Sequence, residues 1–261
     1  MKLLATRRRH PMALVVLLLV GLLLTGGAYA LFSSSTTAKA DEYSAADIEK
    51  GNKLFVTNCA TCHGINAEGT ENGPSLIGVG AAAVDFQVGT GRMPLQMHGP
   101  QAQVKAPQFS DEEISQMAGF VASLGPGPAV PEEEYLNTAE GDAAAGGGLF
   151  RTNCAMCHNV VGAGGALTRG KYAPNLSEVS EKHLYEAMQT GPQNMPMFND
   201  ANLSPEEKRD VVTYIREVSE ETSPGGFKLG SLGPVSEGLF IWFFGLASVI
   251  GITVWLTARS K

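Results

Sequence analysis

The stretch LFVTNCATCH, residues 54–63, decides the fold because the chain contains it twice. Residues 149–158 read LFRTNCAMCH, so eight of ten positions are identical at an offset of 95 residues. Downstream, Met93-Pro94 in the first copy corresponds to Met195-Pro196 in the second. An internal repeat of this length indicates two tandem domains of one kind.

All four cysteines of the chain belong to two Cys-x-x-Cys-His motifs, formed by Cys59, Cys62 and His63, and by Cys154, Cys157 and His158. This is the attachment sequence of c-type haem, in which two thiols bond the vinyl groups and the histidine ligates iron. A zinc ribbon needs its two cysteine pairs roughly 15–20 residues apart, and a thioredoxin-like pair needs a βαβ context that is missing here. A disulfide across two residues would be strained. The motifs therefore predict two covalently bound haems.

A second axial ligand is expected for each iron if the haems only transfer electrons. Met93 and Met195 are the predicted ligands, because each precedes a proline, follows a glycine-containing loop and occupies a matching place in the repeat. Met97, His98 and Met197 are nearby alternatives. A methionine also serves as a core filler, so spacing alone does not decide between them.

The end of each copy is predicted to be helical. Capping-box sequences open at Ser110 and Ser204, and apolar residues follow both at helical spacing. The region between the motif and this last helix is expected to be mainly loop. His183 and Met188 are assigned to an ordinary helix face.

Two apolar runs flank the repeat. Residues 12–32 and 239–256 carry no charge, and both are close to the length that spans a bilayer. Basic residues on the terminal side of each run predict that both chain ends are cytoplasmic and that the repeat lies outside. A cleaved signal peptide is the alternative for the first run, because Ala28-Tyr29-Ala30 and Ala38-Lys39-Ala40 resemble cleavage sites.

The repeat itself is acidic. Residues 33–235 contain 13 basic and 25 acidic side chains, a net charge of −12. Such a body repels phosphate backbones, so no nucleic-acid partner is expected. It suits a protein partner with a basic docking face.

From about residue 44 onward the chain resembles the dihaem cytochrome c subunit of the actinobacterial menaquinol:cytochrome c reductase, the cytochrome bc complex. The resemblance is carried by the two Cys-x-x-Cys-His motifs, by Gly91-Arg92-Met93-Pro94, by residues 191–196, by Leu229-Gly230 and by residues 233–238. It implies that an iron–sulfur protein reduces the first haem and that the second haem feeds a haem–copper oxidase in the same supercomplex. The implied partners are cytochrome b, the Rieske iron–sulfur subunit, the oxidase and membrane lipid. As the redox subunit of this translocase, the chain is expected to have no substrate-binding catalytic site of its own.

The fold expected from these observations is mainly α, with two tandem small cytochrome c domains and transmembrane helices at both ends. The expected segments are a cytoplasmic N-terminus (1–11), a transmembrane helix or signal peptide (12–32), a first domain (44–125), a flexible linker (126–137), a second domain (138–222), a second linker (223–236), a transmembrane helix (237–257) and a cytoplasmic tail (258–261). The haem domains are expected on the outer face of the plasma membrane.

Two other functions share parts of this pattern. A stand-alone membrane-anchored dihaem carrier would have the same motifs, although the stretch before the last apolar run favours the reductase subunit. A dihaem peroxidase needs an iron with a releasable site, and two matched Met-Pro pairs argue against one.

Overall fold

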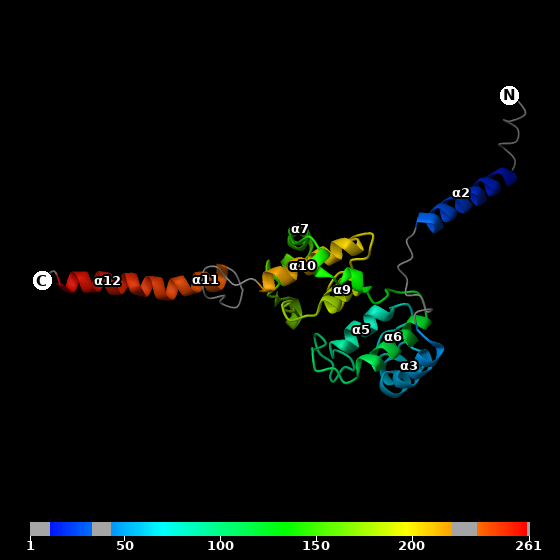
Figure 1. Ribbon diagram of the computed structural model, residues 1–261, viewed down its shortest axis with the longest axis horizontal. Coiled ribbons are helices and arrows are strands. Elements are labelled where there is room, and N and C mark those ends of the chain that lie inside the picture. Colours follow the sequence, from blue (N-terminus) through cyan, green and yellow to red (C-terminus); the bar gives the residue numbers. More distant parts are fainter. Residues whose placement is uncertain (1–10, 33–42, 221–233, 260–261) are drawn as a thin grey trace, which may run out of the picture. The chain divides into compact units, whose positions relative to one another are not determined.

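Two helix pairs, one in each copy of the repeat, form the framework of the fold (Figure 1). In the first copy α3 (Ala45–Asn58) packs against α6 (Asp111–Ser123), and in the second α7 (Ala143–Asn153) packs against α10 (Pro205–Glu220). This computed structural model describes residues 11–32, 43–220 and 234–259. In each domain the opening helix, which leads into the motif, thus packs against the closing helix.

Side-chain caps fix where the closing helices begin. Ser110 Oγ accepts a hydrogen bond from Glu113 N (3.4 Å), and Glu113 Oε2 accepts one from Ser110 N (2.9 Å). The same reciprocal pair joins Ser204 and Glu207, at 3.2 and 2.8 Å. Both capping boxes predicted from the sequence are thereby confirmed.

The apolar residues at helical spacing lie in two separate cores. In α6 they are buried, as are the corresponding residues in the middle of α10: Ile114, Met117, Ala118, Val121, Val211, Val212 and Ile215. An aromatic pair joins the two helices of each domain. Ring centroids of Phe55 and Phe120 lie 5.2 Å apart, and those of Phe150 and Tyr214 lie 5.3 Å apart.

A glycine at matching positions allows each helix pair to approach closely. A Cβ on Gly51 would lie 1.9 Å from the carbonyl oxygen of Gln116, and one on Gly146 would lie 1.9 Å from that of Asp210. Both contacts are to backbone, which has no rotamer with which to move away. The repeat therefore preserves a packing requirement as well as a cofactor motif.

Gly146→Ala should lower the free energy of unfolding by about 1–3 kcal/mol, the usual cost of overpacking a core. Gly148→Ala is the matched control, since a Cβ there has nothing within 4 Å. Removing this helical glycine should raise stability by about 0.5–1 kcal/mol. Denaturant unfolding measures the free energy of unfolding of both variants. Equal changes in Gly146→Ala and Gly148→Ala would contradict this explanation.

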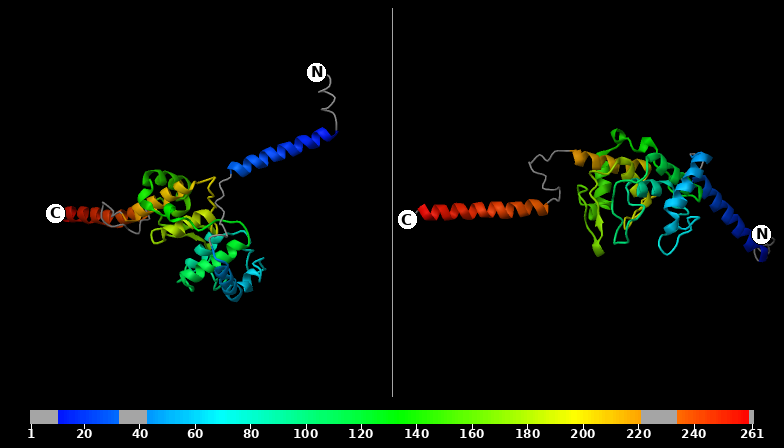
Figure 2. Two further views of the ribbon diagram at one scale, coloured as in Figure 1. Left: turned by 45° about the vertical axis from the view of Figure 1, so that its right-hand side comes forward. Right: turned by 90° about the horizontal axis from the view of Figure 1, so that it is seen from below.

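The regions expected to be mainly loop also contain helices α5 (Ala81–Gly89) and α9 (Glu181–Thr190). Most of both regions is loop, as predicted; α5 was not foreseen, because its alanine- and valine-rich residues are buried on most sides and show no amphipathic period. The second copy adds a short antiparallel pair, β1 (Gly165–Ala166) with β2 (Tyr172–Ala173). Helices α5 and α9 contact each other where the two domains meet (Figures 1 and 2).

The first predicted linker, residues 126–137, packs against both domains. Ala82 N donates to Pro128 O (3.1 Å), and the Arg209 guanidinium donates to Glu134 O (3.3 Å). Gly80 has a φ of 79°, and a Cβ on it would lie 2.4 Å from Pro128 N. The glycines in this region serve close backbone packing, which is why the expectation of a flexible tether was wrong.

The terminal apolar runs form helices. The first run is α2 (Pro11–Phe32); the last comprises α11 (Pro234–Phe240), a π-helical stretch η6 (Ile241–Gly245) and α12 (Leu246–Arg259). Among the described residues, one helix, Val235–Arg259, is long and apolar enough to cross a membrane. Transmembrane insertion of the N-terminal run stays a prediction. The N-terminal basic cluster, residues 38–40, most of the second linker and residues 260–261 lie outside the described residues.

Candidate haem sites

Each Cys-x-x-Cys-His motif occupies one helical turn directly after the opening helix of its domain. The turns are α4 (Ala60–His63) and α8 (Ala155–His158). Cys59 N donates to Phe55 O at 2.7 Å, and Cys154 N donates to Phe150 O at 2.8 Å. A helical turn places residues three apart on one face, so both thiols of a pair are presented to the same side.

The motif histidines are held in the same way in both domains. His63 Nδ1 lies 2.7 Å from Pro74 O, and His158 Nδ1 lies 3.1 Å from Pro174 O. A carbonyl accepts only from a protonated nitrogen, so this contact fixes the tautomer and leaves Nε2 free to ligate a metal. Burial lowers the pKa of His158, although the Pro174 hydrogen bond opposes this, and the neutral imidazole is favoured.

A large apolar cavity adjoins the second motif. Its empty space, including the opening to solvent, measures about 1090 Å³. Predicted site residues and apolar side chains share its wall: Cys154, Cys157, His158, Met195, Leu176, Leu184, Met188 and Phe198. The structure thus brings together all four residues predicted for the second haem.

The candidate methionines differ from their neighbours in burial. Met93 packs against the core of the first domain, whereas Met97 is 78% exposed and His98 is exposed. Met195 packs against the second core, and Met197 is 54% exposed. These positions favour Met93 and Met195 as the interior thioethers.

Burial also affects the first thiol of each motif. It raises the pKa of Cys59 to about 11, with a smaller contribution from the neighbouring Cys62. Cys154 is raised to about 11 for the same reasons, with Cys157 as the neighbour. Each first cysteine is therefore a partly buried thiol, which suits a thioether bond to a group that packs against the core.

The first domain supplies part of the second cavity, which the sequence did not indicate. Phe86, Arg92 and Gln101 line it. The buried Arg92 guanidinium lies 4.7 Å from the ring centroid of Phe86. Gln101 Nε2 donates to Tyr172 O (3.0 Å), and Tyr172 N donates to Gln101 Oε1 (2.9 Å). Of these residues, only Arg92 lies beside a predicted site residue, because it directly precedes Met93.

This set of groups fits a covalently attached haem in the second domain. Two thiols, an imidazole with a free Nε2 and a half-buried thioether border an apolar cavity. The first domain repeats the motif, the histidine–carbonyl contact and the packed methionine.

Comparison with known proteins agrees with this arrangement. Residues 48–125 match the family described as "Cytochrome c", and residues 141–215 match "Cytochrome C oxidase, cbb3-type, subunit III". The protein named "Cytochrome bc1 complex cytochrome c subunit" from Mycobacterium leprae is 46% identical, over 94% of this chain and 87% of its own length. Its namesake from Corynebacterium efficiens is 46% identical over 86% of this chain and 80% of its own length.

Cytochrome c domains imply covalently bound c-type haem. Membership of a bc1 complex implies a redox role within a multi-subunit assembly that is associated with a membrane. The identity extends over nearly the whole chain and both copies of the repeat. The chain therefore belongs to the family of cytochrome c subunits of the cytochrome bc1 complex.

Proposed function

We propose that this chain carries electrons from the Rieske iron–sulfur subunit of a menaquinol:cytochrome c reductase through two covalent c-type haems to a haem–copper oxidase. The proposal rests on the duplicated motif and on family membership. In the reductase, which is proposed to be a translocase, its proposed neighbours are cytochrome b and the Rieske protein. The oxidase is its proposed neighbour in a supercomplex.

The observation that carries the proposal is the shared wall of the second cavity. Phe86 and Arg92 belong to the first domain, yet they border the cavity that holds the second motif. A carrier that passes electrons between two centres needs those centres close together. The contact between α5 and α9 supports the proposal, because it brings the two domains together.

The chain's own groups have defined parts in this role. Cys59 and Cys62 would attach the first haem, with His63 and Met93 as axial ligands. Cys154 and Cys157 would attach the second, with His158 and Met195 as axial ligands. The bound haem supplies reversible one-electron chemistry, and methionine–histidine ligation raises its potential. An iron held by both a histidine and a methionine would have no position left for a substrate.

The membrane arrangement follows from the end segments. The helix Val235–Arg259 would anchor the chain in the lipid, and α2, with 22 residues, is about 33 Å long and would provide a second span. We propose that the haem domains face the outside and that both termini are cytoplasmic. A chain whose N-terminal run is cleaved would be single-pass.

Purification of the native chain from its own membranes tests the assembly. Mass spectrometry should find cytochrome b, the Rieske protein and oxidase subunits in the same particle. A chain recovered alone under mild detergent conditions, while those subunits copurify with one another, would support a stand-alone carrier instead.

Carbon monoxide tests whether the haems are closed. The dithionite-reduced chain, with both haems attached and separated from the oxidase, should show almost no spectral change on exposure to the gas, because both sixth positions are proposed to hold methionine. A full ferrous–carbonyl spectrum from one haem would indicate a releasable site, as a peroxidase requires.

A further inference from the structure

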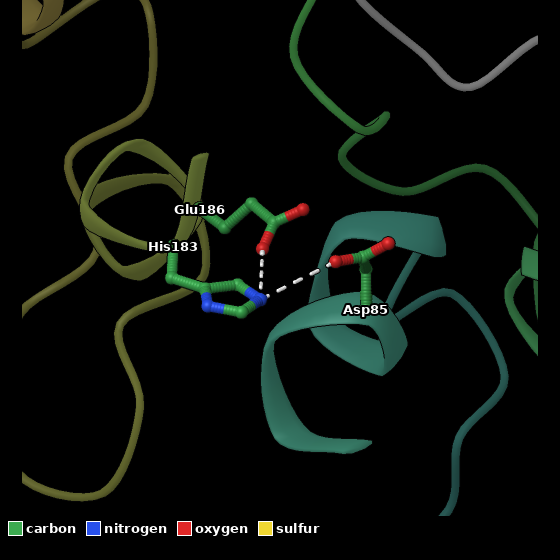
Figure 3. Close-up of side chains that lie close together, drawn as sticks. All are labelled: Asp85, His183 and Glu186. Atoms are coloured by element: carbon green, nitrogen blue, oxygen red, sulfur yellow. Dashed lines mark ion pairs between the residues drawn. The ribbon is translucent and has the colours of Figure 1, made fainter. Parts of the chain in front are cut away.

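A second cluster of possible ligands lies at the contact between the two domains, apart from the eight proposed haem-binding residues. Asp85 extends from α5, and His183 and Glu186 extend from α9 toward it (Figure 3). One ligand atom from each residue lies within 4.8 Å of the others. The sequence analysis had assigned His183 to an ordinary helix face and had singled out neither acid.

Glu186 makes the cluster unlike a surface salt bridge. Its side chain is 0% exposed, and neither of its carboxylate oxygens has a hydrogen-bond partner among the described residues. Burying a carboxylate without partners is costly, so such a group is kept protonated or is matched by a cation.

The distances suit a common metal ion. His183 Nε2 lies 3.6 Å from Asp85 Oδ1 and 4.0 Å from Glu186 Oε2. Three atoms bound at about 2.1 Å from zinc in trigonal or tetrahedral geometry lie about 3.4–3.6 Å apart, so small side-chain shifts are sufficient. One imidazole with two carboxylates is a donor set that zinc accepts, and magnesium and calcium prefer oxygen donors alone.

The backbone leaves room for this arrangement. A Cβ on Gly89 would lie 2.8 Å from His183 Nε2, so the glycine permits the imidazole to reach α5. The ring of His183 is also held edge-on to Phe86, with centroids 6.1 Å apart. The imidazole is thus positioned between the two acids before any ion binds.

Lys182 is the cation already near the cluster. Its Nζ lies 2.8 Å from Asp85 Oδ1, and with His183 it outweighs the effect of burial and lowers the pKa of Asp85. The Lys182 side chain is 40% exposed and can turn into solvent, and it forms no ion pair with Glu186. Lys182 therefore pairs with Asp85 and leaves both buried carboxylate oxygens of Glu186 without a hydrogen-bond partner.

We propose that Asp85, His183 and Glu186 bind a divalent transition-metal ion, with zinc as the best-matched ion, and that this ion joins the two haem domains. Two charges on the ion balance the two carboxylates. One ligand comes from the first domain and two from the second, so occupancy stabilises the contact between them. The inference does not depend on the proposed electron route.

The test uses the full chain with its haems attached, purified in detergent and treated with EDTA. Equilibrium dialysis against zinc chloride, with zinc measured by mass spectrometry, should give one bound ion per chain. Glu186→Gln, His183→Gln and Asp85→Asn should each weaken binding at least about tenfold. Glu178→Gln is the matched control, because it removes one carboxylate charge from the exposed Glu178 and should bind zinc like the wild type.

Zinc-edge X-ray absorption should show nitrogen and oxygen ligands at about 2.0–2.2 Å and no sulfur. Haem content and far-UV circular dichroism show whether each variant is folded. Because the variants lie in both domains, the test still stands if one of them does not fold. Failure of the wild type to bind stoichiometric zinc would overturn the proposal and leave a Lys182–Asp85 ion pair. Equal binding by the wild type and all three cluster variants would also overturn it.

Discussion

Replacing Cys154 and Cys157 together by alanine should leave an assembled reductase that accepts electrons from quinol but delivers none to oxygen. The two thiols are the proposed covalent links of the second haem, and without them the second domain should hold no haem. The first haem keeps its own motif, so quinol should still reduce it. Oxygen consumption should fall to the background of inhibited membranes.

The corresponding change in the first domain is the matched control. Replacing Cys59 and Cys62 should also leave one haem, but quinol should then reduce neither domain, because the proposed entry point is lost. Stopped-flow reduction and oxygen electrode measurements on both variants distinguish the two positions. Normal respiration by the Cys154/Cys157 variant, with assembly intact and no added cytochrome c, would show that the second haem is not an obligatory carrier.

Met195→Ala should remove the iron–sulfur charge-transfer band of one oxidised haem and lower its reduction potential. A thioether ligand favours ferrous iron, so its loss should cost ~0.1 V or more of the ~0.8 V range over which axial ligands set haem potentials. Met197→Ala is the control two residues away, since Met197 is 54% exposed. Spectroelectrochemical titration of the two variants gives both readouts.

The same comparison applies to the first haem. Met93→Ala should lose the second charge-transfer band, and Met97→Ala should keep both, because Met97 is 78% exposed. Retention of the band in Met93→Ala together with its loss in Met97→Ala would transfer the axial role to Met97.

The sequence was sufficient for features that repeat or follow a fixed spacing. The two motifs, the capping boxes at Ser110 and Ser204, and the apolar face of α6 each depend on residues within a few positions of one another. Local hydrogen bonds and helical periodicity decide such features, so they can be read without a structure.

The contact between the domains could not be read in this way. Helix α5 is buried on most sides, and its pattern does not distinguish a helix from an apolar loop. Asp85 and His183 are nearly 100 residues apart, and no repeat marks them as neighbours. The same applies to Gln101 and Tyr172, which pair across the domains through backbone and side-chain groups.

The glycines illustrate a second limit. Gly127 lies in the linker that was predicted to be flexible, yet a Cβ on it would lie 2.4 Å from Gly80 N. A glycine that permits close approach and one that permits motion are identical in sequence, and only the neighbouring backbone distinguishes them.

Mass spectrometry of the denatured native chain tests the central claim, that one chain carries two covalent haems, most directly. Covalent haem stays with the peptide through acid extraction, so the intact mass should exceed that of the mature peptide by two haems. Peptide mapping should place one haem on the fragment with Cys59 and Cys62 and one on the fragment with Cys154 and Cys157. A chain that keeps a single haem, or whose cysteines bind zinc, would contradict the account.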